Sequence, residues 1–97
     1  MISGSYRGKT DLEVAWNIHL ASEAAKSLWQ QGYAVICPHL NSAHFDGICK
    51  DEVWLKGYLE ILKRCDGIFV LRNSENSVGT QNEIALAKQL GKFILYQ

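Results

Sequence analysis

The stretch Ser77-Val78-Gly79-Thr80-Gln81-Asn82-Glu83 joins an apolar run, Ile68-Phe69-Val70-Leu71, and its polar loop to a helical pattern that extends from Ile84 to Leu90. The apolar run has the length of a strand. The chain therefore passes from a strand through a loop and a Ser/Gly turn into a helix. The first amides of a helix have no partner within the helix and point outward. This order of elements predicts an anion site at the start of the helix.

Three residues in this stretch carry the chemistry of such a site. Ser77 can cap the helix or bind an anion, and Gly79 allows a ligand to approach the backbone closely. Glu83 follows about one turn further along, on the face shared with Gly79 and Thr80. A carboxylate placed just beyond a phosphate site is suited to cleaving a nucleotide. The alternative is a plain N-cap followed by an exposed glutamate, and the segment alone leaves both interpretations open.

The rest of the chain alternates between apolar runs and helical patterns. Continuous apolar runs suit strands that are covered on both faces. Apolar residues at spacings of three and four mark a helix over Asp11–Gln31, with Thr10 or Asp11 as its N-cap and Gly32 as its end. We predict strands at residues 1–3, 33–37, 67–71 and 92–96, and helices at 11–31, at 51–64 and from the Ser/Gly turn to 90.

Strands separated by helices imply parallel pairing with right-handed crossovers. We therefore predict one α/β domain over residues 1–97, a three-layer α/β/α sandwich with a parallel, Rossmann/flavodoxin-like sheet of four to five strands. Ligands of such sheets bind at the carboxyl ends of the strands. That edge would collect the Gly4–Gly8 loop, the long aperiodic His39–Asp46 segment and the Arg72–Glu83 stretch.

Basic side chains in these loops are candidates for binding a phosphate. Arg7, Lys9 and Arg72 each belong to a loop at the predicted edge, and guanidinium and ammonium groups are the usual partners of phosphate oxygens. Each is equally compatible with a simply solvated side chain.

The composition excludes several classes of protein. The chain has 10 basic and 10 acidic residues, whereas proteins that coat nucleic-acid polymers or membrane surfaces carry a basic excess. No run of residues has the length and hydrophobicity of a membrane span, and no signal-peptide pattern opens the chain. We expect a cytoplasmic protein.

The three cysteines, Cys37, Cys49 and Cys65, form no C-x-x-C pair. In the cytoplasm we expect them to be reduced and partly buried. Their spacings to His39 and His44 fit no common zinc finger or ribbon. We therefore expect no metal and no cofactor.

Two features predict a homodimer or a higher homo-oligomer. The last strand is followed by no helix that would cover its outer side, so a short edge or a partner molecule has to protect it. Trp16, Trp29 and Trp54 are many tryptophans for so small a domain, and they suggest an apolar helix surface that needs a neighbour.

Four motifs, taken in order, point to a known family. They are Ile2-Ser3-Gly4-Ser5-Tyr6-Arg7-Gly8, Cys37-Pro38-His39-Leu40-Asn41, the Cys65-Asp66 turn, and Ser77-Val78-Gly79 followed by Glu83-Ile84. Together they resemble the nucleoside 2-deoxyribosyltransferase-like superfamily and, within it, the small DUF4406 branch, which is related to 2′-deoxynucleoside 5′-phosphate N-hydrolases. The resemblance covers nearly the whole chain.

The resemblance implies a nucleotide or nucleoside as the small-molecule substrate. Relatives cleave or transfer the N-glycosidic bond of deoxynucleosides or of nucleoside 5′-monophosphates. The glutamate that matches Glu83 is their nucleophile, and the serine that matches Ser77 helps to bind the 5′-phosphate. Gly4, Ser5, Arg7 and Gly8 match the first-loop signature, which lines the same pocket.

This chain departs from the family pattern at two positions. Relatives carry an aspartate in the second helix that assists the departing base, and Tyr58 stands at that place. Met1 stands where relatives carry a tyrosine. The acid for the departing base would then come from Asp46, His44 or His39 in the long loop, since a histidine titrates near neutrality. For each of the three, an ordinary loop hydrogen bond is the alternative.

Two functions follow as expectations. The first is an enzyme, a hydrolase or transferase, with Glu83, Asp46 and His44 as catalytic residues. Its substrate site is expected to contain Gly4, Ser5, Arg7, Gly8, His39, Ser77 and Gly79. The second is a non-catalytic nucleotide-binding or sensor module that has lost the base-side acid, in keeping with Tyr58. A purely structural dimerisation domain would explain the tryptophans but not the clustered polar residues.

Overall fold

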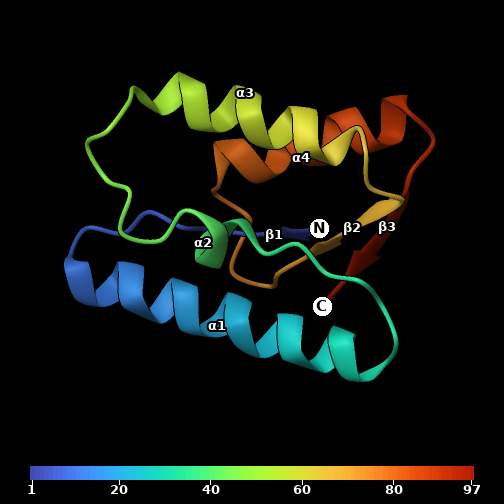
Figure 1. Cartoon of the computed structure of the whole chain (residues 1–97), viewed down its shortest axis with the longest axis horizontal. Helices are drawn as coiled ribbons and strands as arrows, with labels where there is room; N and C mark the ends of the chain where they lie inside the picture. The colour runs from blue at the N-terminus through green and yellow to red at the C-terminus, as the bar shows by residue number, and fades with distance from the viewer.

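The computed structural model describes all 97 residues of the chain. Three parallel strands form one sheet in the order β1-β2-β3. Four helices accompany the sheet, and Figure 1 shows α1 on one side of the strands and α3 with α4 on the other. The elements are β1 (Ile2–Ser3), α1 (Asp11–Gln30), α2 (Pro38–Asn41), α3 (Asp51–Leu62), β2 (Gly67–Val70), α4 (Val78–Gln89) and β3 (Phe93–Tyr96).

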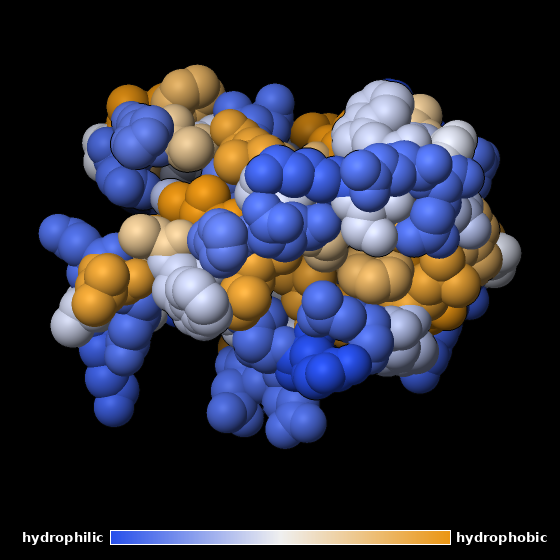
Figure 2. Space-filling view, turned by 90° about the horizontal axis from the view of Figure 1, so that it is seen from below, coloured by the Kyte–Doolittle hydropathy of each residue, from blue (hydrophilic) through white to orange (hydrophobic).

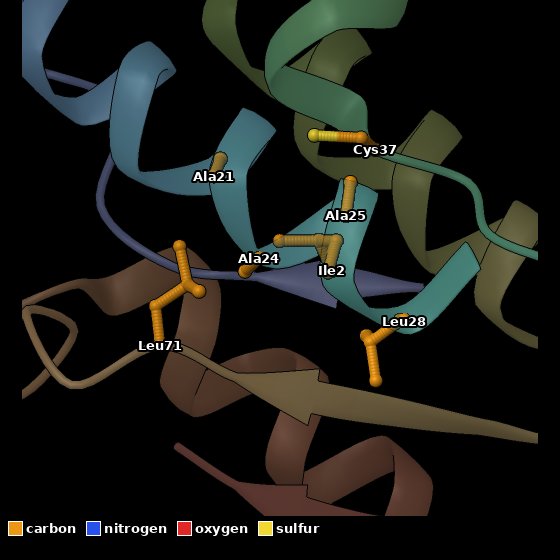
Figure 3. Packing of buried hydrophobic residues seen from close by; sticks show 7 residues of the cluster. All are labelled: Ile2, Ala21, Ala24, Ala25, Leu28, Cys37 and Leu71. Carbon is orange, nitrogen blue, oxygen red and sulfur yellow. The ribbon is translucent and has the colours of Figure 1, made fainter. Parts of the chain in front are cut away.

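The side chains of β2 alternate between two hydrophobic clusters. Phe69 and the adjoining Leu71 pack with α1, in a cluster that contains Ile2, Ala21, Ala24, Ala25, Leu28 and Cys37 (Figure 3). Ile68 and Val70 pack on the opposite face with Leu62 of α3 and Ala87 of α4. Alternation of this kind follows from the pleat of a strand. It explains why an unbroken apolar run was correctly predicted as a strand covered on both faces.

The helix boundaries agree closely with the sequence pattern. The hydroxyl of Thr10 accepts a hydrogen bond from the amide of Glu13 at 3.1 Å, so Thr10 caps α1 as predicted. Gly32 has a φ of +97°, a left-handed conformation that ends a helix and favours glycine. The alanines of α1 let this helix lie close to the sheet, while Trp16 and Trp29 on it are 59% and 56% exposed.

The sheet has three strands, so the prediction of four to five was wrong at residues 33–37. This segment forms no strand, although the carbonyl of Ile36 accepts a hydrogen bond from the amide of Ile2 at 2.9 Å. The physical reason is the length of β1, which has two residues and offers too few partners for a second ladder. Tyr33 and Ile36 are 43% and 42% exposed, unlike residues of a strand covered on both faces.

The segment after Pro38 also differs from the aperiodic loop that the sequence suggested. Residues 38–41 form the short helix α2, with Pro38 in its first turn, where proline is favoured because no amide is needed.

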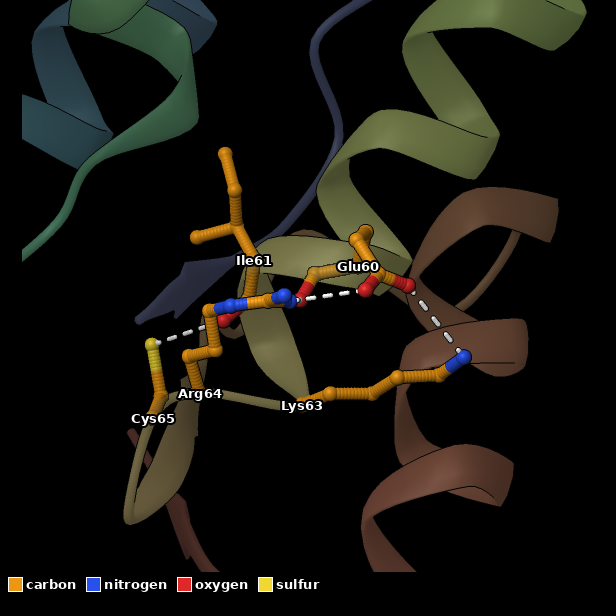
Figure 4. A network of polar contacts seen from close by, with 5 residues as sticks. All are labelled: Glu60, Ile61, Lys63, Arg64 and Cys65. Atoms are coloured by element: carbon orange, nitrogen blue, oxygen red, sulfur yellow. Dashed lines mark hydrogen bonds and ion pairs between the residues drawn. The ribbon is translucent and has the colours of Figure 1, made fainter.

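The second long helix, α3, ends at Leu62 rather than at the predicted Arg64. A polar network follows its end, in which Glu60 pairs with Lys63 and Arg64, and the thiol of Cys65 donates to the carbonyl of Ile61 (Figure 4).

Apolar side chains remain exposed on β3, the last strand of the chain and an edge strand of the sheet. Phe93, Leu95 and Tyr96 of β3 are 45%, 37% and 63% exposed. Viewed from the α1 side, the surface shows hydrophobic areas between hydrophilic side chains (Figure 2). None of the helices is both long enough and apolar enough to cross a membrane.

Candidate functional site

The start of α4 has the geometry that the sequence predicted. Ser77 is the N-cap, and its hydroxyl accepts a hydrogen bond from the amide of Thr80 at 3.2 Å. Gly79 packs against Leu55 of α3, and a Cβ atom added at Gly79 would stand 3.4 Å from the Cδ2 atom of Leu55. Serine at the N-cap satisfies one of the free amides, and the remaining amides of the first turn are available to an anion.

Glu83 lies one turn further along α4 and reaches the end of β1. The hydroxyl of Ser3 donates a hydrogen bond of 2.5 Å to the Oε1 atom of Glu83. Ser3 is 1% exposed, and Glu83 is partly buried. The alternative of a freely exposed glutamate is therefore wrong.

The surroundings of Glu83 act on its pKa in opposite directions. Burial raises the pKa of this carboxyl above its ordinary value, because a charged group loses hydration. The hydrogen bond from Ser3 and the amino group of Met1 lower the pKa and offset part of the effect of burial. The result is a carboxyl that is poorly hydrated and held by a specific donor, which is a common property of functional carboxylates.

The loop after β1 is fixed by side chains from three other segments. The hydroxyl of Ser5 donates to the carbonyl of Asn73 at 2.8 Å, and the Nε2 atom of His39 lies 3.0 Å from the carbonyl oxygen of Ser5. Asn17 on α1 donates to the carbonyls of Tyr6 and Arg7 at 3.2 Å. The structure thus brings Ser5 and His39 together, as the convergence of loops at one sheet edge predicted.

Two glycines of this loop are required by close packing. A Cβ atom on Gly4 would lie 2.6 Å from the Cδ1 atom of Leu71, and one on Gly8 would lie closer still to the Cβ atom of Glu13. Both distances are shorter than any ordinary contact between carbon atoms. Gly4 and Gly8 therefore allow the loop to lie against β2 and α1, which is a packing role independent of any ligand.

An open groove of about 590 Å³ lies on the α1 side of this loop. It is lined by Ser5, Arg7, Gly8, Leu12, Glu13, Trp16, Asn17, Asn73 and Asn76. Three of the predicted site residues, Ser5, Arg7 and Gly8, belong to the groove, whereas Glu83, Ser77 and Gly79 do not. Arg7 forms an ion pair of 2.7 Å with Asp51 at the start of α3, and both side chains are 67% exposed. Such exposed pairs exchange readily with solvent or with another anion.

The predicted acids of the long loop lie in different surroundings. Burial and the negative charge of Asp46 raise the pKa of Tyr6, with a smaller contribution from Tyr58, so these three side chains lie near one another. His44 is exposed and has a φ of +66°, and no hydrogen bond to its side chain is formed. Asp46 is exposed as well, but it lies beside Tyr6 of the first loop.

Tyr58 is tied to the segment that contains α2. Its hydroxyl lies 2.7 Å from the hydroxyl of Ser42, accepts a hydrogen bond from the side-chain Nδ2 atom of Asn41 at 3.2 Å and donates to the carbonyl of Pro38 at 3.3 Å. These contacts connect α3 to the loop in which His39 and Asp46 lie. A tyrosine at this position thus performs a structural task that a shorter aspartate side chain would not reach.

Two buried polar atoms have no hydrogen-bond partner, the Nδ1 atom of His39 and the Oγ1 atom of Thr80. Burial also lowers the pKa of His39, so its ring is neutral near pH 7, donates from Nε2 and keeps Nδ1 as a free acceptor. No group of three or more His, Cys, Asp or Glu side chains has the arrangement of a metal site.

Sequence reasoning missed several residues of the site. Ser3 and Tyr6 belong to the first motif, but neither was proposed as a site residue, and Asn17, which donates to two carbonyls of the first loop, was not proposed either. The signal that could have found Ser3 is its place at the carboxyl end of a strand, beside the predicted crossover to a loop.

The parallel sheet and the helices beside it define an α/β domain. The whole chain from residue 2 to residue 96 matches the family model described as a domain of unknown function, DUF4406, and the protein belongs to this family. No curated protein and no solved structure matches the chain.

Proposed function

We propose that the protein cleaves or transfers the N-glycosidic bond of a nucleoside or deoxynucleoside 5′-monophosphate, with Glu83 as the nucleophile. This proposal includes membership of the nucleoside 2-deoxyribosyltransferase-like superfamily and a three-layer Rossmann/flavodoxin-like domain. The observation that carries it is the position of Glu83, a poorly hydrated carboxylate held by Ser3 in the second turn of α4.

The proposed reaction has two steps. A carboxylate oxygen of Glu83 bonds to the anomeric carbon while the glycosidic bond from that carbon to the base nitrogen breaks. The electron pair of the broken bond leaves with the base. The base nitrogen takes up a proton from an acid of the protein, for which we propose Asp46, because it lies beside Tyr6 and Tyr58. Water, or a second base, then attacks the same carbon and releases Glu83.

The phosphate of the substrate would occupy the start of α4. The amides of its first turn and the hydroxyl of Ser77 suit a dianion, because the positive end of the helix dipole lies there. Arg7 is a second candidate, since its ion pair with Asp51 is exposed and can be exchanged for a phosphate.

A non-catalytic nucleotide-binding module is the second candidate function. The observation that favours it is Tyr58, whose hydroxyl is occupied by contacts to Pro38, Asn41 and Ser42 and supplies no carboxylate to the base. In that case a monophosphate binds without being cleaved.

Purified protein incubated with a panel of ribo- and deoxynucleoside 5′-monophosphates separates the two functions. Release of free base, detected by chromatography and lost in Glu83→Gln, would establish the enzyme. A rise in melting temperature with a monophosphate and no free base would establish the binding module. If no nucleotide releases free base and none raises the melting temperature, both proposed functions are ruled out.

We also propose a homodimer or higher homo-oligomer, on the strength of the exposed Trp16, Trp29 and Tyr96. Light scattering coupled to size-exclusion chromatography measures the mass directly. A monomeric mass at micromolar concentration would contradict it.

A further inference from the structure

Ser3 lies at a position where its side chain can act on Glu83 and on little else. It is the last residue of β1, pairs with Val70 in the register of the sheet, and accepts a backbone hydrogen bond of 2.8 Å from the amide of Leu71. It is 1% exposed. The backbone of Ser3 is thus held by β2, and its hydroxyl points to the second turn of α4.

The hydrogen bond between the two side chains has a defined direction. An ionised carboxylate only accepts hydrogen bonds, so the hydroxyl of Ser3 donates to the Oε1 atom of Glu83. No protein donor is bonded to the other oxygen, Oε2, and this atom is not among the buried atoms that lack a partner. One oxygen is therefore held, and the other is unbonded and reaches accessible space.

We propose that Ser3 is a positioning residue, which holds the Oε1 atom of Glu83 and thereby presents Oε2 as the oxygen that attacks the anomeric carbon. This inference rests on the proposed function, because it assigns a role within the same reaction. Attack requires a near-linear approach of one oxygen to the carbon, and a carboxylate free to rotate would meet that condition only part of the time.

The burial of Ser3 makes a specific kinetic prediction. A residue that is 1% exposed does not touch the substrate, so its loss changes the orientation of the nucleophile and not the affinity for the nucleotide. In Ser3→Ala we expect kcat to fall by about tenfold to a hundredfold, the equivalent of losing a hydrogen bond to a charged group, with KM nearly unchanged. In Ser3→Cys, whose thiol is a weak donor, the loss should be smaller.

A readout that does not depend on turnover tests the contact itself. The hydrogen bond from Ser3 and the amino group of Met1 both lower the pKa of Glu83. Removing the hydroxyl should therefore raise that pKa further. The side-chain carboxyl carbon of Glu83, labelled with carbon-13 and assigned by its loss in Glu83→Gln, reports the titration by NMR. In active protein, the acid limb of the kcat/KM profile should move to higher pH by the same amount.

Ser74→Ala is the matched control. Ser74 is also a buried serine after a strand, 4% exposed, but its hydroxyl donates to the carbonyl of Leu71 and not to Glu83. We expect this variant to leave the titration of Glu83 unchanged. A general loosening of the fold would instead move the titration in both variants, and that result would overturn the proposal.

The outcomes separate this inference from the proposed function. An active wild type whose Ser3→Ala variant keeps full kcat and an unmoved acid limb would overturn the role of Ser3 and leave Glu83 as the nucleophile. A wild type that releases no base would end the proposed function and the role of Ser3 with it. In that case the NMR titration would still show whether the two side chains interact. If Ser3→Ala does not fold, Ser3→Cys is titrated instead: its weaker donor should raise the pKa of Glu83, and an unmoved pKa would overturn the proposal.

Discussion

The Nε2 atom of His39 lies 3.0 Å from the carbonyl oxygen of Ser5, so a residue of the short helix α2 holds the loop that follows β1. His39 is 3% exposed, and its hydrogen bond joins residues that are 34 positions apart in the chain. This contact fixes the segment that contains α2, which forms no strand, against the loop that follows β1.

The burial of His39 predicts a pH-dependent stability. Its pKa in the folded protein is lowered, so in the window below about 6.5, the ordinary value, the unfolded chain binds more protons. The free energy of unfolding should therefore fall as the pH falls through that window. In His39→Gln, which keeps a donor but does not titrate, this component should vanish. Urea unfolding between pH 5 and pH 7.5 measures it.

His19→Gln is the control for that experiment, because His19 lies exposed on α1 and stacks on Trp16. It should retain the pH dependence of the wild type. If His39→Gln retained it as well, the buried imidazole would not be its source.

Glu83 should destabilise the fold at neutral pH. The pKa of Glu83 is higher in the folded protein than in the unfolded chain, so the folded state binds more protons between the two pKa values. The protonated carboxyl therefore favours folding below the unfolded pKa. This contribution to the free energy of unfolding is lost as the pH rises through the folded pKa. Glu83→Gln still accepts the hydrogen bond from Ser3 and carries no charge. We expect this variant to unfold at a higher urea concentration than the wild type at pH 7.5, and at nearly the same concentration near pH 4.

The exposed Glu75 supplies the comparison for this prediction, since Glu75→Gln removes the same charge from the loop before α4. It should change the stability little at either pH. An equal gain in both variants would mean that net charge, rather than the burial of Glu83, is responsible.

Gly4→Ala should destabilise the protein. The new Cβ atom would stand 2.6 Å from the Cδ1 atom and 2.9 Å from the Cβ atom of Leu71, and that Cβ cannot move without its strand. Overpacking of this kind costs about 1–3 kcal/mol. Gly57→Ala is the opposite case, because nothing lies within 4 Å of its added Cβ in the middle of α3. It should stabilise by about 0.5–1 kcal/mol, and both values follow from urea unfolding.

Ser77→Ala should affect stability and ligand binding together. Loss of an N-cap costs about 0.5–2 kcal/mol, and Thr10→Ala, which removes the cap of α1, should cost a similar amount. The two variants should differ in the rise of melting temperature with a nucleoside 5′-monophosphate, which only Ser77→Ala should reduce. An equal response in both would place the phosphate elsewhere.

The sequence was sufficient for the features that depend on neighbouring residues. The strands β2 and β3 and the helices α1, α3 and α4 were predicted within about two residues of their ends, because apolar periodicity and capping side chains act over one or two turns. The caps Thr10 and Ser77 are in this class. The roles of the predicted site residues stay predictions.

The predictions failed where a residue depends on a distant partner. Residues 33–37 have the apolar composition of a strand, yet a strand exists only if a neighbour supplies a ladder, and β1 is too short to do so. The exposure of His44 and the separation of Glu83 from the groove at Ser5 and Arg7 likewise depend on how the loops pack, while the catalytic role of His44 stays a prediction.

The sequence by itself thus determined that this protein is an α/β domain with a parallel sheet and a serine-capped helix that carries Glu83. Only the tertiary structure decided that Ser3, which is 80 positions away, donates to Glu83, and that His39 holds Ser5. The physical reason is range: backbone conformation responds to adjacent side chains, whereas a contact between a strand end and a helix face depends on the packing of the whole core.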